Sequence, residues 1–306
     1  ASDVYKRQAL KIARKWGYEK KGIENDKAVI VVCEGNFHGR TTTIISFSND
    51  EEARKNFNPY TSGFVSIPYG DADALAKVLH DNADNICGFL VEPIQGEAGV
   101  NVPPDGYLSA CKQLCKDNNV LFIADEIQTG IARTGKMLAI DYENVKADIL
   151  ILGKALSGGA YPVSAVLADD DVMNVIQPGQ HGSTYGGNPL ACAIAREALQ
   201  VVLDEKLQEN AFELGEFFRA EITKLVDNFS ILKSVRGKGL LNALLINDTP
   251  ESETAWNFCL KLAEKGLLAK PTHGNIIRFA PPLVITKEQI IDCIRIIEET
   301  TIEMSN

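Results

Sequence analysis

The sequence has few of the features that mark a metal-binding or membrane-spanning protein. Its seven cysteines are odd in number and scattered, with no C-x-x-C pair, and its four histidines show no ligand spacing. We therefore expect reduced, mostly structural thiols and no metal site. No stretch approaches the roughly 18 consecutive apolar residues of a membrane span. The reduced thiols indicate an intracellular protein. Because any targeting segment would lie upstream of residue 1, the sequence does not decide between the cytoplasm and the mitochondrial matrix.

Positive charge is also scarce. The chain carries 31 lysines and arginines against 41 aspartates and glutamates, a formal net charge of −10. This balance argues against nonspecific binding to nucleic acid or to an anionic membrane surface. The 306 residues, 45% of them hydrophobic, are enough for two domains or one large α/β domain with a sizeable core.

Short apolar runs alternate with amphipathic stretches in the first two thirds of the chain. The runs are rich in β-branched residues and bounded by turn residues, which is typical of strands buried on both faces. The predicted strands are 28–33, 86–91, 120–124 and 149–152, and the predicted helices between them are 72–79 and 107–116. This order predicts an α/β fold with a mainly parallel central sheet sandwiched by helices.

The chain changes character after a helical, alanine-rich connector at about 189–203. The predicted helices that follow are 210–226, 253–265 and 287–302, and the predicted strands are near 231–235, 240–246, 267–269 and 276–279. We therefore predict a large domain over 1–204 and a smaller C-terminal α+β domain over 205–306.

Two charged residues follow apolar strands in the predicted large domain. Asp125 ends the stretch VLFIAD, and Lys154 follows the aliphatic run Ile149–Leu152 and Gly153. Ligands of open α/β sheets bind at the carboxyl ends of the strands, where both residues should lie. A lone strand-end aspartate is more often a helix cap or a structural ion pair, but a lysine at the same edge favours a chemical role.

Pyridoxal 5′-phosphate needs this pair of residues, because it forms a Schiff base with a lysine and has a pyridinium nitrogen that pairs with an acid. We expect Lys154 and Asp125 to be catalytic, with Asp125 keeping the ring nitrogen protonated and Lys154 moving a proton. Burial would lower the pKa of the lysine from about 10.4 toward neutrality. The predicted large domain would then be the cofactor-binding one.

The motifs around these residues resemble the class III, fold-type I pyridoxal-phosphate aminotransferases, and among them the ornithine aminotransferases. The resemblance runs from about Ala9 to the C-terminus. The motifs that carry it are EGNFHGR, VEPIQGEAGV, LFIADEIQTGIARTG, DILILGKALSGG, GQHGSTYGGNP, VRGKGLL and GLLAKPTHGNIIRFAPPL.

The resemblance implies further cofactor-binding residues. Phe37 would stack on the cofactor ring, and Ile127 would pack on the opposite face. Gln128 would bind the phenolic oxygen. Ser183 and Thr184 would reach the cofactor phosphate of the neighbouring subunit, which implies a homodimer or a larger assembly. Hydroxyls beside glycines suit a phosphate, but a plain turn is the structural alternative.

The resemblance also implies substrate-binding residues. Arg40 would receive the substrate α-carboxylate, a task suited to a planar guanidinium, with a surface ion pair as the alternative. Glu92 and Glu97 match acidic positions, and Glu97 would pair with Arg278. That pair would mask the arginine when ornithine binds and open for the second carboxylate of 2-oxoglutarate. The family commonly has tryptophan where this chain has His38.

The predicted function is therefore transfer of the δ-amino group of ornithine to 2-oxoglutarate, giving glutamate 5-semialdehyde and glutamate. The alternatives are an acetylornithine or 4-aminobutyrate aminotransferase, a decarboxylase or aminomutase that uses the same two residues, and a truncated chain with little activity. Fold alone decides among none of these.

The first eight residues do not fit the resemblance. In the family, a turn of small residues precedes the helix that begins ALKIARKWGY and holds the cofactor phosphate at the helix N-terminus. Here the bulky segment VYKR replaces that turn. We predict that residues 1–8 are foreign or mistranslated sequence joined to a truncated coding region, and that Leu10, Ala13 and Trp16 face inward. Such a chain would bind the cofactor weakly.

Overall fold

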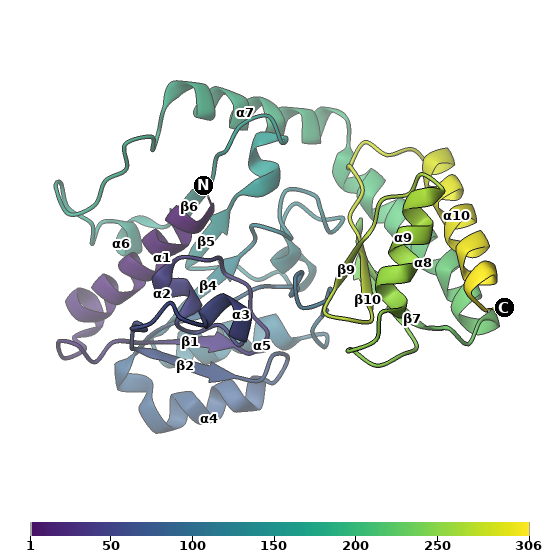
Figure 1. Cartoon of the computed structure of the whole chain (residues 1–306). Coiled ribbons are helices and arrows are strands. Elements are labelled where there is room, and N and C mark those ends of the chain that lie inside the picture. Colours follow the sequence, from purple (N-terminus) through teal and green to yellow (C-terminus); the bar gives the residue numbers. More distant parts are fainter. Residues whose placement is uncertain (1, 306) are drawn as a thin grey trace. The chain divides into compact units, whose positions relative to one another are not determined.

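The structure, a computed structural model, describes residues 2–305, with side chains from residue 6 onward. The chain forms two compact units (Figure 1). The first unit comprises the residues up to Pro93, Pro103–Gly130 and Ile140–Gln200, and the second comprises Ile94–Val102, Ile131–Ala139 and the chain from Val201 onward. The domains 1–204 and 205–306 stay a prediction.

The first unit is built on a six-stranded sheet with the strand order β2-β1-β3-β4-β5-β6. Its strands are β1 Val29–Cys33, β2 Phe64–Ile67, β3 Ile86–Val91, β4 Leu121–Asp125, β5 Ile149–Leu152 and β6 Ala165–Ala168. The pairings from β2 to β5 are parallel, and β6 joins the edge antiparallel to β5. This arrangement confirms the mainly parallel sheet.

Helices cover this sheet on both faces, as predicted. Helix α1 (Ser2–Trp16) buries Leu10, Ala13 and Trp16 against alternate residues of the central strands, including Ile123 of β4. Side chains alternate between the faces of a strand, so Phe122 points to the other face. Helix α5 packs on β4. The remaining helices of this unit are α2 Thr42–Ile45, α3 Glu51–Arg54, α4 Ala72–Asn82, α5 Tyr107–Asp117 and α6 Asp170–Met173.

The second unit contains a four-stranded antiparallel sheet with the order β7-β8-β10-β9. Its strands are β7 Leu232–Lys238, β8 Leu241–Ile246, β9 Lys270–Thr272 and β10 Ile276–Phe279. Its helices are α8 Leu207–Asn228, α9 Thr254–Glu264 and α10 Lys287–Ser305, and α7 Pro189–Asp204 leads into it from the first unit. The three helices and the sheet enclose one apolar core. The C-terminal part is thus the predicted α+β unit.

Two local predictions were wrong. The strand expected at 267–269 begins at Lys270, because the backbone N–H of Leu267 still caps helix α9 by donating to Leu262 O at 2.9 Å. Helix α1 begins at Ser2 rather than near Ala9, so the bulky segment that we expected to replace a turn is helical. The foreign origin of residues 1–8 stays a prediction, and Ala1 lies outside the described residues.

Candidate functional site

Asp125 and Lys154 lie at the same edge of the six-stranded sheet. Asp125 is the last residue of β4 and is paired in register with Ile151 of the neighbouring strand β5. Lys154 comes two residues after β5 ends, at the start of a 3₁₀ turn. Because β4 and β5 are parallel, their carboxyl ends meet at one edge, as the sequence predicted.

The residue before Lys154 has to be small. A Cβ on Gly153 would lie only 3.3 Å from Ile127 Cγ1 and 3.3 Å from Ser164 Cβ, tighter than ordinary van der Waals contact. Lys154 itself has a φ of 42°, in the left-handed region that non-glycine residues seldom adopt. Such strained backbone concentrates at functional sites. Lys154 is exposed, so the predicted burial of this lysine was wrong: the chain leaves β5 toward Gly159, where no described atom lies within 4 Å of an added Cβ.

Asp125 is almost fully buried and accepts hydrogen bonds from three groups. Its Oδ2 lies 2.9 Å from the Lys6 Nζ and 2.7 Å from the His38 Nδ1, and its Oδ1 accepts from the Ile127 N–H at 3.2 Å. Burial alone would raise the pKa of Asp125, but the charge of Lys6 and the hydrogen bonds outweigh it and hold that pKa well below its usual range. Asp125 is therefore a carboxylate at neutral pH.

His38 is neutral in this setting. Burial lowers its pKa below the ordinary value, and the Asp125 carboxylate offsets this only in part. The Nδ1–H therefore donates to Asp125, while the buried Nε2 has no hydrogen-bond partner among the described residues. A neutral donor holds the carboxylate in place without cancelling its charge.

Phe37 lies near the Lys6 ammonium that pairs with this carboxylate. Its half-buried ring has the Lys6 ammonium 6.0 Å from its centroid and the Arg40 guanidinium at 5.6 Å. Its backbone N–H donates to Glu92 Oε1 at 2.7 Å, which fixes the turn after β1. Arg40 is exposed and makes a long ion pair of 3.7 Å with Asp50.

The other predicted cofactor residues are distributed along the same unit. Ile127 is buried and packs on Gly153, whereas Gln128 next to it is half-buried. Ser183 and Thr184 lie on an exposed loop, where Ser183 Oγ accepts from the Gly186 N–H at 3.1 Å. The structure therefore brings Asp125 and Ile127 together and places Phe37 near the Lys6 ammonium that pairs with Asp125, whereas Ser183 and Thr184 lie on an exposed loop.

Glu97 and Arg278 meet in the second unit. Arg278 lies in β10, between Ala243 of β8 and Lys270 of β9, and its Nη1 donates to Glu97 Oε1 at 2.7 Å. The Arg278 side chain is 16% exposed and the Glu97 side chain 23%, so the pair is shielded but within reach of solvent. The ion pair that the resemblance implied is present.

The loop that carries Glu97 is firmly attached to the sheet of its unit. Gln95 and Asn101 exchange both backbone hydrogen bonds, at 3.1 and 3.0 Å. The Arg236 guanidinium donates twice to Gly99 O, at 3.0 and 2.8 Å. Gly99 has a φ of 103°, and a Cβ there would meet Ile276 Cδ1 at 2.5 Å. The Glu97 carboxylate is thus presented by a rigid support.

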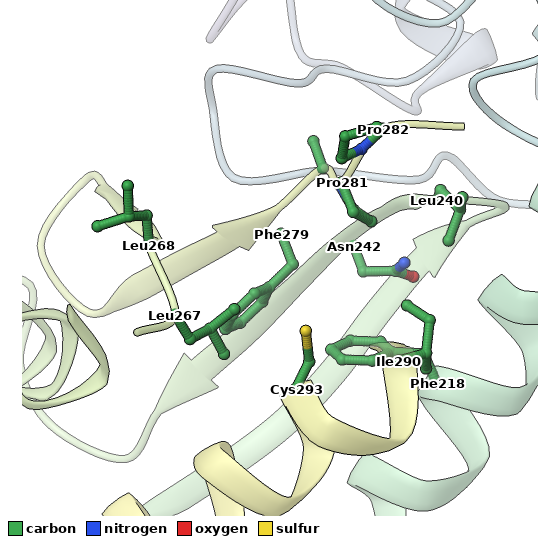
Figure 2. A pocket seen from close by; sticks show the side chains of 11 residues that line it. Phe218, Leu240, Asn242, Leu267, Leu268, Phe279, Pro281, Pro282, Ile290 and Cys293 are labelled. Carbon is green, nitrogen blue, oxygen red and sulfur yellow. The ribbon is translucent and has the colours of Figure 1, made fainter. Parts of the chain in front are cut away.

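A cavity of about 230 Å³ lies elsewhere in the second unit and contains none of the predicted site residues (Figure 2). Its lining is mainly apolar and includes the rings of Phe218 and Phe279, whose centroids are 5.6 Å apart. Its one amide, Asn242, already bonds to Gly239 O and Arg219. Burial raises the pKa of the Cys293 thiol, which makes it a poor nucleophile. The cavity offers no chemistry.

The described residues contain no cluster of three or more side chains suited to a metal ion. Within that same part of the chain, no helix is long and apolar enough to cross a membrane.

Sequence reasoning missed two groups at the candidate site. Lys6 was assigned to a segment without a role, and His38 was treated only as a departure from an aromatic position. Both bind Asp125, across 119 and 87 residues of sequence. The one available signal was that His38 shortly follows the predicted strand 28–33, whereas nothing local marks a lysine for burial.

Comparison with known proteins gives one family and consistent relatives. The family model described as aminotransferase class-III matches residues 5–301, so it begins inside the segment 1–8. The mitochondrial ornithine aminotransferase of Drosophila ananassae is 56% identical over 97% of this chain and 67% of its own length. The chain spans between 60% and 67% of the length of the curated relatives that it matches at 56% identity.

Solved structures agree with this result. The ornithine aminotransferase of Toxoplasma gondii is 47% identical with a TM-score of 0.95, covering 99% of this chain and 72% of that one. The acetylornithine aminotransferase of Elizabethkingia anophelis is 59% identical with a TM-score of 0.88, covering 99% of this chain and 73% of that one.

Proposed function

The chain belongs to the class-III aminotransferase family, and from this premise we propose that it transfers the δ-amino group of ornithine to 2-oxoglutarate, giving glutamate 5-semialdehyde and glutamate. The observation that carries the proposal is the buried, ionised Asp125 on the strand next to Lys154. The similarity to ornithine aminotransferases supports the choice of substrates. Relatives named as mitochondrial support a mitochondrial matrix location, with the cytoplasm as the alternative.

Members of this family use pyridoxal 5′-phosphate, and the first unit has residues that fit it. A carboxylate whose pKa is held low suits a protonated ring nitrogen, and Phe37 offers an aromatic face near the ammonium that pairs with that carboxylate. Lys154, an exposed residue, lies at the same sheet edge. When bound, the cofactor supplies an electron-withdrawing ring for the carbon that carries the substrate amine.

We propose a role for each of the cofactor-binding residues of the chain. Asp125 would hold the ring nitrogen and keep it protonated, and Lys154 would move a proton at the reacting carbon. Phe37 and Ile127 would hold the ring, and Gln128 would bind its phenolic oxygen. Each role follows from the family resemblance and remains part of the proposal.

The groups that bind substrate and phosphate complete the proposal. Arg40 binds the α-carboxylate, and Glu92 fixes the turn that carries Phe37. Arg278 binds the second carboxylate of 2-oxoglutarate, and Glu97 masks it when ornithine is the donor. Ser183 and Thr184 reach the phosphate of the neighbouring subunit, so we propose a homodimer or a larger assembly.

An acetylornithine aminotransferase is the second candidate, because one of the solved relatives with that name is 59% identical. The purified chain should be assayed with ornithine, acetylornithine and 4-aminobutyrate as donors and 2-oxoglutarate as acceptor, with Lys154→Ala as the inactive control. We expect ornithine to be the preferred donor. Preference for acetylornithine or 4-aminobutyrate would refute the substrate, and carbon dioxide release would indicate a decarboxylase.

A further inference from the structure

The Lys6 side chain reaches from helix α1 to the candidate site. It is 5% exposed, although lysine is among the residues least often buried. Its Nζ lies 2.9 Å from Asp125 Oδ2, 3.5 Å from Phe37 O and 6.0 Å from the centre of the Phe37 ring. A buried ammonium with these neighbours needs its counter-charge, because the cost of desolvating it is otherwise uncompensated.

Asp125 has little acceptor capacity left. A carboxylate oxygen offers about two lone-pair sites. On Oδ2 these are met by Lys6 and His38, and Oδ1 accepts from the Ile127 N–H. A ring nitrogen that arrives at Oδ2 must therefore replace one of the two donors.

Lys6 is the donor that can leave. The His38 side chain is fully buried, with its ring 6.0 Å from that of Phe47. Lys6 instead approaches on a flexible four-carbon stem from the second turn of helix α1, which begins at Ser2. Its ammonium also lies over the Phe37 ring, 6.0 Å from the ring centroid.

We propose that Lys6 is the resident counter-ion of Asp125 and competes with the ring nitrogen of pyridoxal phosphate for Oδ2. The cofactor then binds only as the Lys6 ammonium withdraws, which lowers its affinity for this chain. This inference rests on the proposed function, because it concerns the cofactor of that same site. It gives Lys6 an effect on cofactor affinity opposite to that of a cofactor ligand.

The test is calorimetric titration of the 306-residue chain with pyridoxal 5′-phosphate, comparing wild type, Lys6→Met and Arg7→Met. Arg7 is exposed and adjacent on the same helix, so its replacement removes the same charge without touching Asp125. We expect the Kd to fall by about tenfold or more in Lys6→Met, the effect of losing a charge-assisted bond. The Kd of Arg7→Met should equal that of the wild type.

A second pair of variants tests whether Lys6 acts through Asp125. With Asp125→Asn as background, Lys6→Met should change the Kd no further. Circular dichroism checks folding, and Lys6→Gln serves the same comparison if Lys6→Met aggregates. Equal affinities in wild type and Lys6→Met, or weaker binding in the variant, would overturn this inference alone. Absence of binding in every chain would overturn it together with the proposed function.

Discussion

Replacing Glu97 should change which amino donors the chain accepts. Glu97→Gln keeps the size of the side chain but removes the charge that faces Arg278 at 2.7 Å. Both partners are less than a quarter exposed, so solvent screens their attraction only in part. A charge-assisted bond of this kind contributes about 1.5–3 kcal/mol. The variant should therefore shift the donor preference from ornithine toward glutamate by about tenfold or more.

The assay is a single-turnover measurement of the two half-reactions, one with ornithine and one with glutamate. Each observed rate constant is divided by its substrate concentration to give a second-order rate constant. The quantity to compare is the ratio of these two constants. Glu216→Gln is the matched control, because Glu216 pairs with Arg219 in the same unit and the substitution removes the same charge. An unchanged ratio in Glu97→Gln, or an equal shift in Glu216→Gln, would refute the idea that Glu97 masks Arg278.

Three further substitutions test the first unit. Lys154→Ala should abolish turnover but alter the free energy of unfolding by no more than about 0.5 kcal/mol, because the side chain is exposed; a borohydride-reduced adduct on another lysine would contradict this role. Asp125→Asn should lower the free energy of unfolding by about 3–5 kcal/mol at pH 7, because it leaves the Lys6 ammonium buried without its partner. Since the pKa of Asp125 is held low, its stabilisation is present above the ordinary value of 3.8 and is lost as the pH falls below it. The wild-type Tm should therefore drop more steeply than that of Asp125→Asn below about pH 4. Arg40→Ala should slow both half-reactions and spare the Tm, whereas unchanged kinetics would reduce Arg40 to its surface pair with Asp50.

The strands that sequence predicts best are those whose side chains are buried on both faces. Ile86–Val91 and Ile149–Leu152 have the predicted bounds, because a continuous apolar run ends where the strand leaves the core. The edge strands Phe64–Ile67 and Ala165–Ala168 were not predicted. Their residues are mostly half-buried or exposed, so no apolar run marks them. Edge strands are determined by pairing with a neighbouring strand, and that strand can be distant in sequence.

The candidate site could be predicted only where buried apolar runs mark it, as for the strands. Asp125 and Lys154 could be found because each follows a buried run, and the parallel order brings such ends together. The contacts of Asp125 with Lys6 and His38 could not be found in this way. They join helix α1 and the turn after β1 to the end of β4, so they depend on how elements distant in sequence pack.

The residues proposed for chemistry and those proposed for specificity lie in different units. Lys154 and Asp125 belong to the first, whereas Glu97 and Arg278 belong to the second. The segment 94–102 directly follows the first unit in sequence, yet Ile94 and Val100 are buried with Leu241 and Ala243 of β8. Local sequence cannot assign this segment, because an apolar residue fits either core equally well. It follows that the Glu97–Arg278 pair is formed entirely within one compact unit, so its strength is set by β10 and the 94–102 loop and should survive substitution of Lys154 or Asp125.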